Sequence, residues 1–146
     1  MKLSSFIKVA PMLVGVAAMV GCNGITSLAK RGPVGAYTAI ILVTTENSVA
    51  TNELANGGSF TINLADDGTT SGHLHRAASG SNPAFDADMA GTWTQYGNTV
   101  EFTQAAETFV RGMPFTIESL TDRIWWLVGD DVFGTTRVNV RLAQNK

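Results

Sequence analysis

Apolar and polar residues alternate with a period of two along much of the chain after residue 34. Phe60, Ile62 and Leu64 alternate with polar neighbours, and the same alternation recurs at 99–103 and 137–142. Because successive side chains of a β-strand point to opposite faces, this pattern predicts strands with one buried and one polar face. About eight strands are expected, at residues 35–43, 60–65, 70–76, 89–96, 99–103, 109–117, 123–129 and 135–142.

The segments between these strands carry the residues that turns require. Asp66-Asp67-Gly68-Thr69 and Gly97-Asn98 predict tight hairpins, since glycine adopts positive φ without strain. Gly112-Met113-Pro114 predicts a bend or break in the strand that contains it. The order of the elements favours an all-β fold, a small barrel or a sandwich of antiparallel strands. Two longer polar segments are expected to be loops: Thr44–Gly58, with a helical turn around Val49–Ala55, and Ala77–Asp88.

The inward positions of the predicted strands carry a set of apolar side chains that should form one core. An eight-stranded barrel either fills with side chains or holds one small ligand, and the pattern leaves both open. Phe60, Trp93 and Phe102 are the candidate contacts for such a ligand. The short chain favours a packed interior, with at most a shallow site near the Thr44–Gly58 and Ala77–Asp88 segments. The core set is Phe60, Ile62, Leu64, Leu74, Trp93, Val100 and Phe102.

Two predicted strands break the alternation. Ala39–Val43 and Ile124–Val128 are apolar at every position. A strand that is apolar on both faces needs cover on its outer side. We expect the Thr44–Gly58 loop to provide it, and the alternatives are the N-terminal tether, a partner protein or a membrane surface. An exposed patch at Trp125–Leu127 would instead mark a binding surface.

The N-terminal residues resemble the signal peptide of bacterial lipoproteins. Two lysines precede an apolar run at Val9–Val20, which is too short to span a bilayer but suits a secretory signal. Met19-Val20-Gly21-Cys22 resembles the lipobox, although that family usually has Leu where Met19 stands. The resemblance implies that Cys22 takes a diacylglyceryl group and becomes the mature N-terminus. We therefore expect a signal peptide at 1–21, a lipidated tether at 22–33 and a barrel domain at 34–146.

The same resemblance implies an address in the cell envelope. Asn23 follows the cysteine where Asp would favour the inner membrane, so the outer membrane is favoured. The mature chain would keep eight basic and twelve acidic residues, a net charge of −4. The basic residues are scattered, which argues against a nucleic-acid partner. Cys22 is the only cysteine, so no disulfide forms within the domain and core packing must stabilise it.

The predicted barrel resembles the lipocalin-like domains of short bacterial lipoproteins over residues 34–142. The matching motifs are Gly35-Ala36-Tyr37-Thr38, Gly58-Ser59-Phe60, Gly91-Thr92-Trp93 and Gly97–Phe102. The resemblance implies a small up-and-down barrel that binds a small apolar ligand. Lipocalins proper have Trp in the first strand, where this chain has Tyr37. In each Gly-x-aromatic pair, glycine lets a neighbouring strand or side chain approach closely, and the aromatic points to the same face.

A pair of histidines is the strongest candidate for a metal site. His73 and His75 lie two residues apart on one strand face, and Asp86 and Asp88 repeat that spacing. Such a set can ligate zinc. The histidines share the parity of the polar positions, however, so we expect solvated outer-face residues and no metal.

The sequence predicts neither catalysis nor a cofactor. Asp66-Asp67 and Asp130-Asp131 are interpreted as turn residues rather than paired acids. The chain has no nucleophile elbow, zinc-protease motif or phosphate-binding loop. The sequence favours an envelope lipoprotein that is anchored through Cys22 and binds a small apolar ligand. The alternative is a packed barrel that acts on an envelope protein as an interaction or inhibitor module.

Overall fold

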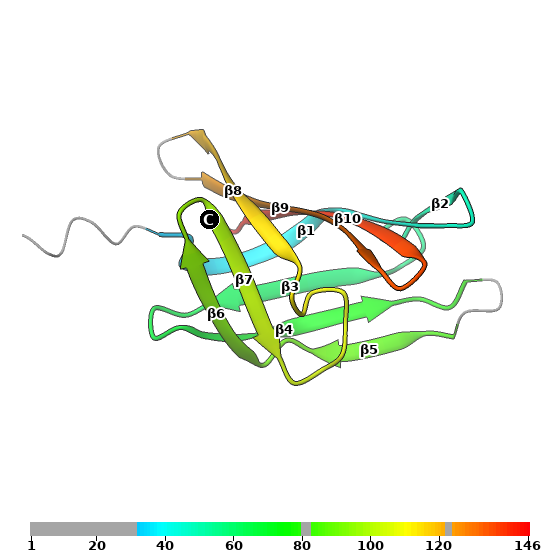
Figure 1. The fold of residues 1–146 in the computed structure, drawn as a ribbon, viewed down its shortest axis with the longest axis horizontal. Helices are drawn as coiled ribbons and strands as arrows, with labels where there is room; N and C mark the ends of the chain where they lie inside the picture. The colour runs from blue at the N-terminus through cyan, green and yellow to red at the C-terminus, as the bar shows by residue number, and fades with distance from the viewer. Residues whose placement is uncertain (1–31, 80–82, 122–123) are drawn as a thin grey trace, which may run out of the picture. The chain divides into compact units, whose positions relative to one another are not determined.

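The computed structural model describes the chain at residues 32–79, 83–121 and 124–146. Within these ranges, eight antiparallel strands close a barrel, and two short strands extend it (Figure 1). The predicted all-β barrel is confirmed. The signal peptide, Cys22 and nearly all of the tether lie outside the described residues. The strands are β1 (Gly35–Glu46), β2 (Val49–Asn52), β3 (Ser59–Leu64), β4 (Thr69–Arg76), β5 (Phe85–Asp88), β6 (Gly91–Tyr96), β7 (Thr99–Gln104), β8 (Pro114–Thr121), β9 (Ile124–Phe133) and β10 (Thr136–Gln144).

The barrel is an up-and-down meander in which neighbours in the sheet follow one another along the chain. The order is β1-β3-β4-β6-β7-β8-β9-β10, and β10 pairs with β1 to close it. In the described ranges, no helix has the length and apolar character needed to cross a bilayer.

The end of the last strand is hydrogen-bonded to the residues at which the chain enters the barrel. Tyr37 is opposite Gln144 in the β1–β10 ladder. Beyond that pair, the Gln144 side-chain amide donates to the Val34 carbonyl at 2.9 Å, and the Asn145 N–H donates to the Ala36 carbonyl at 2.8 Å. The two ends of the domain therefore lie together at one end of the barrel.

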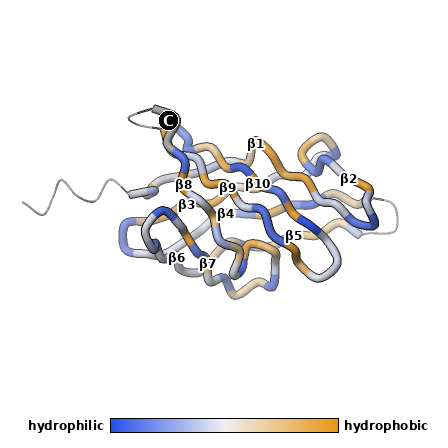
Figure 2. The backbone as a smooth tube through the Cα atoms, turned by 45° about the horizontal axis from the view of Figure 1, so that its top comes forward, coloured by the Kyte–Doolittle hydropathy of each residue, from blue (hydrophilic) through white to orange (hydrophobic). Residues whose placement is uncertain are grey.

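A β-bulge accounts for the apolar run in β1. The β1–β10 register shifts between Ala39 and Ile41, so Ile40 is an extra residue and is 48% exposed. Ala39 precedes the bulge and Leu42 follows it, and both are buried. An extra residue in one strand reverses the parity after it, so the inward positions before and after the bulge are three residues apart and have opposite parity. Figure 2 shows the apolar run along β1 beside the alternating colours of β10.

Three expectations about the less regular segments need correction. Val49–Asn52, predicted as part of a helical turn, forms β2 instead, because Asn47 and Ser48 adopt positive φ and turn the chain back along β1. This segment was also expected to cover the outer face of β1. In the described residues, β2 instead pairs with Val43–Glu46 of β1 in the plane of the sheet. Phe85–Asp88, placed in a loop, forms β5 against β4.

The apolar run in β9 forms no exposed patch. Leu127 is buried, and Trp125 packs against the core. The Arg141 guanidinium lies over the Trp126 ring, 4.8 Å from its centroid, and so covers part of the outer face.

The predicted core is confirmed. Six of its seven residues are at most 2% exposed, and Trp93 is half-buried and packs against them. Two edge-to-face aromatic pairs, Phe60 with Phe109 and Phe102 with Phe115, fix the geometry of this core.

Candidate functional site

A cavity lies at the end of the barrel opposite the chain entry. There the wall is incomplete: in the described part of the sheet, β5 pairs with β4 alone, and Asp130–Phe133 of β9 pairs with β10 alone. The segment 105–113 joins β7 to β8 in this region (Figure 1). The strands that extend past this gap leave a cavity of about 190 Å³.

The cavity has an apolar wall and a polar wall. The apolar side chains come from β1, β4, β5, β9, β10 and the 105–113 segment. They are Leu42, Leu74, Phe85, Phe109, Phe133 and Val138. The polar side chains come from β1, the turn after β2, β4, the same segment and β10. They are Thr44, Glu53, Arg76, Glu107, Thr108 and Thr136.

Glu53 is the most constrained of the polar residues and is only 3% exposed. Its N–H donates to the Leu42 carbonyl at 2.9 Å, and its carbonyl accepts from the Gly58 N–H at 2.8 Å. A β-carbon on Gly58 would come within 2.8 Å of that same carbonyl oxygen, so glycine is required for this close approach. The backbone on both sides thus holds Glu53 at the cavity wall.

The Glu53 carboxylate is only partly satisfied by the protein. The Thr44 hydroxyl donates to Oε1 at 2.5 Å, while Oε2 is buried and has no hydrogen-bond partner among the described residues. A buried polar atom without a partner costs about 1–3 kcal/mol, and more when it is charged. The cavity wall therefore includes a buried carboxylate with one unsatisfied acceptor atom.

Arg76 supplies the opposite charge at the same wall. Its Nε is buried without a partner among the described residues. No ion pair joins it to Glu53 in that part of the chain. Both residues also line a second cavity of about 40 Å³, which shares Thr44 and Thr136 with the first and adds Glu46, Thr51 and Ser79. The small cavity thus adjoins the larger one, and all its lining residues are polar, so we call it the polar extension.

The predicted ligand contacts lie elsewhere in the barrel. Phe60 and Phe102 are buried in the core, and the indole N–H of Trp93 donates to the Ala65 carbonyl at 2.9 Å. None of the three is among the residues that line the 190 Å³ cavity, although Phe60 packs on Phe109, which does. Their role in ligand binding stays a prediction.

The position of the cavity agrees with the expectation of a shallow site near the two long segments. Thr44 and Glu53 come from the first segment, and Phe85 comes from the second. Glu53 itself was missed. It lies in a polar stretch without periodicity, so only the fold reveals that its side chain is buried.

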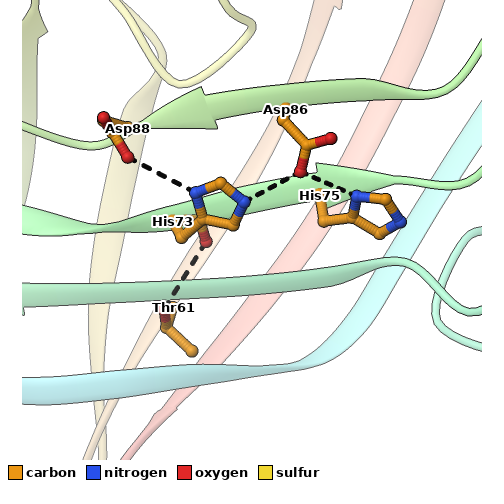
Figure 3. Close-up of polar contacts among 5 residues, drawn as sticks. All are labelled: Thr61, His73, His75, Asp86 and Asp88. Atoms are coloured by element: carbon orange, nitrogen blue, oxygen red, sulfur yellow. Dashed lines mark hydrogen bonds and ion pairs between the residues drawn. The ribbon is translucent and has the colours of Figure 1, made fainter.

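The histidine cluster lies on the outer face of β4 and β5 (Figure 3). His73 is opposite Asp88 and His75 is opposite Asp86 in the ladder. One oxygen of Asp86 contacts both histidines, at 2.9 Å from His73 Nε2 and 2.8 Å from His75 Nδ1. The remaining ring nitrogen of His73 lies 3.5 Å from Asp88. The predicted outer-face placement of the histidines is confirmed.

These contacts shift the protonation equilibria in opposite directions. The hydrogen bond to Asp86, with a weaker one to Asp88, raises the pKa of His73 above its ordinary value of 6.5. Hydrogen bonds from His75 and then His73 lower the pKa of Asp86 below 3.8. Because carboxylates face both ring nitrogens of His73, the geometry favours its doubly protonated form. Among the described residues, no group of three or more potential ligands is arranged to hold a metal ion.

Comparison with known proteins assigns no family. A scan against protein-family models, a search of curated proteins and a search of solved structures each found no match. The lipoprotein and lipocalin-like resemblances therefore stay predictions from the residues. The same holds for lipid attachment at Cys22, which lies outside the described residues.

Proposed function

We propose that this protein is a lipid-anchored lipoprotein of the cell envelope whose barrel binds a small amphipathic molecule. One observation carries the binding proposal: an apolar cavity at the open end of the barrel has the buried Glu53 carboxylate in its wall. Ligand sites are typically apolar concavities with a few fixed polar groups that orient the ligand. The anchor proposal rests separately on the lipobox resemblance around Cys22.

The volume of the cavity limits the ligand. A cavity of about 150 Å³ holds benzene, whereas sites for drug-sized ligands occupy about 300–1,000 Å³. At about 190 Å³, this cavity suits one aromatic ring or a short branched chain. A long acyl chain does not fit the cavity as it stands.

In the described chain, Pro33 and the cavity lie at opposite ends of the barrel. The chain enters at Pro33, beside the start of β1, while Thr44 lines the cavity near the end of the same strand. At a strand rise of about 3.3 Å per residue, Gly35 at the start of β1 and Thr44 are roughly 30 Å apart along the strand. A ligand can thus enter at the end of the barrel opposite Pro33.

A fluorine NMR titration tests the binding proposal. The full chain in phospholipid nanodiscs is titrated with 4-fluorobenzyl alcohol, and empty nanodiscs give the blank. We expect saturable binding to the wild type and its loss in Thr136→Phe, which places a ring in the cavity. Thr94→Phe on the exposed face of β6 is the matched control and should bind normally. Absence of saturable binding in the wild type, or equal loss in both variants, would refute the proposal.

The second candidate is a protein-interaction or inhibitor module, and exposed apolar residues at the hairpin tips favour it. Val49 in the β1–β2 hairpin and Val132 and Phe133 in the β9–β10 hairpin are all more than half exposed. Exposed apolar groups of this kind are typical of partner surfaces when they are contiguous. Photo-crosslinking from position 132 in cells tests this role. A discrete adduct with one envelope protein, without binding of the small probe, would favour it over the first candidate.

A further inference from the structure

The polar extension of the cavity contains two opposite charges that the protein does not pair with each other. Glu53 and Arg76 line both the 190 Å³ cavity and the 40 Å³ cavity. The described residues offer no hydrogen-bond partner to Glu53 Oε2 or Arg76 Nε, and both atoms are buried. Buried charges are ordinarily paired, because an uncompensated charge in a protein interior is strongly unfavourable.

A ligand that satisfies both groups must carry a cation and an anion. A carboxylate oxygen requires a donor, and an ammonium group provides up to three. A guanidinium requires an acceptor, and a carboxylate matches its planar geometry. Thr44 and Thr136 line both cavities. The Thr44 hydroxyl donates to Glu53, so it can accept from an ammonium group, whereas the Thr136 hydroxyl can bond either charged group. Because the polar extension is small, the two ligand charges must be close together.

We infer that the ligand is a small zwitterion, an α-amino acid with an apolar side chain. Its ammonium group lies at Glu53, its carboxylate at Arg76, and its side chain in the apolar part beside Leu74, Phe85 and Phe109. This inference rests on the proposed function and refines it by naming the ligand class. An α-amino acid carries both charges on one carbon, which suits a polar cavity of only about 40 Å³, whereas the two charged termini of a peptide are separated by at least one further residue.

Three probes that share one ring separate the contributions of the two charges. L-Phenylalanine carries both, phenethylamine lacks the carboxylate, and 3-phenylpropanoate lacks the ammonium group. Calorimetric titration uses the full chain in nanodiscs with empty nanodiscs as the blank. We expect L-phenylalanine to bind about tenfold or more tightly than either analogue, since hydrogen bonds to charged groups are the stronger class.

Two conservative substitutions assign each charge to its residue. Glu53→Gln keeps an oxygen that can accept from Thr44, and it should remove the advantage of L-phenylalanine over 3-phenylpropanoate. Arg76→Gln should remove the higher affinity of L-phenylalanine relative to phenethylamine. Glu101→Gln and Arg137→Gln, on exposed faces of β7 and β10, are the matched controls and should leave all three affinities unchanged. Thermal melts confirm that each variant is folded.

The outcomes distinguish this inference from the proposed function. If 4-fluorobenzyl alcohol binds but L-phenylalanine binds no more tightly than both analogues, the zwitterion inference is wrong and the cavity proposal stands. If phenethylamine matches L-phenylalanine, the site recognises cations alone, which also overturns the inference. If neither the neutral probe nor any of the three binds, the proposed function itself fails.

Discussion

Gly91 lies so close to the backbone of Thr103 that a β-carbon on Gly91 would come within 2.2 Å of the Thr103 carbonyl oxygen. The two residues belong to β6 and β7, which pair antiparallel along their whole length. Glycine is thus required by the approach of a backbone, which cannot move aside as a flexible side chain could. The close approach expected for the Gly-x-Trp segment is confirmed.

Gly91→Ala should therefore destabilise the fold. We expect a loss of about 1–3 kcal/mol in the free energy of unfolding, the usual cost of forcing extra volume into a packed region. Denaturant unfolding measures it, and Thr92→Ala on the exposed face of β6 is the control, with an effect within about 0.5 kcal/mol. Equal stability of Gly91→Ala and wild type would show that the two strands can separate locally.

The pairing between His73 and Asp86 should make stability depend on pH. Because the pKa of His73 is raised, its contribution is complete below its unfolded value of 6.5 and is lost as pH rises through the folded value. Because the pKa of Asp86 is lowered, its contribution is present above 3.8 and is lost as pH falls through the folded value. Stability from this pair is thus largest between these two transitions.

NMR titration of the His73 ring checks this coupling directly. The pKa of His73 should lie above 6.5 in the wild type and fall towards it in Asp86→Asn. Asp66→Asn, in the β3–β4 turn, is the control and should leave the His73 titration unchanged. An unshifted His73 in the wild type would contradict the ion pairs in Figure 3.

Zinc should bind no more tightly to the His73 and His75 pair than to ordinary surface histidines. Both side chains are already engaged with Asp86, and a metal would have to replace these contacts. Calorimetry with zinc chloride measures the affinity. Micromolar binding that disappears in His73→Ala would establish a metal site on this face.

Trp93→Ala separates core packing from ligand contact. Trp93 packs against the core and bonds to Ala65 but does not line the cavity, so its truncation should cost about 3 kcal/mol of stability. Binding of 4-fluorobenzyl alcohol to the folded variant should persist. A mild loss of stability with loss of probe binding would instead favour the ligand role predicted for Phe60, Trp93 and Phe102.

Cys22→Ser tests the anchor. If Cys22 carries the lipid, the variant should lose palmitate labelling and membrane retention and accumulate as precursor or soluble protein. Ser27→Ala, elsewhere in the tether, should be processed normally. Retention of the Cys22→Ser protein in membranes without attached lipid would rule out the lipoprotein proposal.

The sequence predicted those parts of the fold whose signal is local. β3, β7 and β10 alternate cleanly, and the hairpin at Gly68 has the positive φ that its glycine suggested. β5 escaped because Ala87 is its only buried residue, so the strand has almost no apolar pattern. The bulge at Ile40 was hidden for the opposite reason, since an unbroken apolar run shows no reversal of parity.

The cavity could be anticipated only as a region. Its lining comes from β1, β4, β5, β9, β10 and two connecting segments, so no window of sequence contains it. Glu53 illustrates the difficulty, because an acidic residue in a polar stretch is ordinarily solvated. Its burial follows from the hydrogen bonds to Leu42 and Gly58, which depend on tertiary structure.

The hydrogen bonds from Gln144 and Asn145 to the entry segment determine how a mechanical load would travel through the domain. A force applied at Pro33 along β1 acts on the antiparallel β1–β10 ladder. The hydrogen bonds of this ladder share the load, so they resist it in shear. The cavity lies at the far end of that ladder, near Thr44 and Thr136. A load at Pro33 is therefore borne at one end of the barrel, while the cavity at the other end keeps its shape.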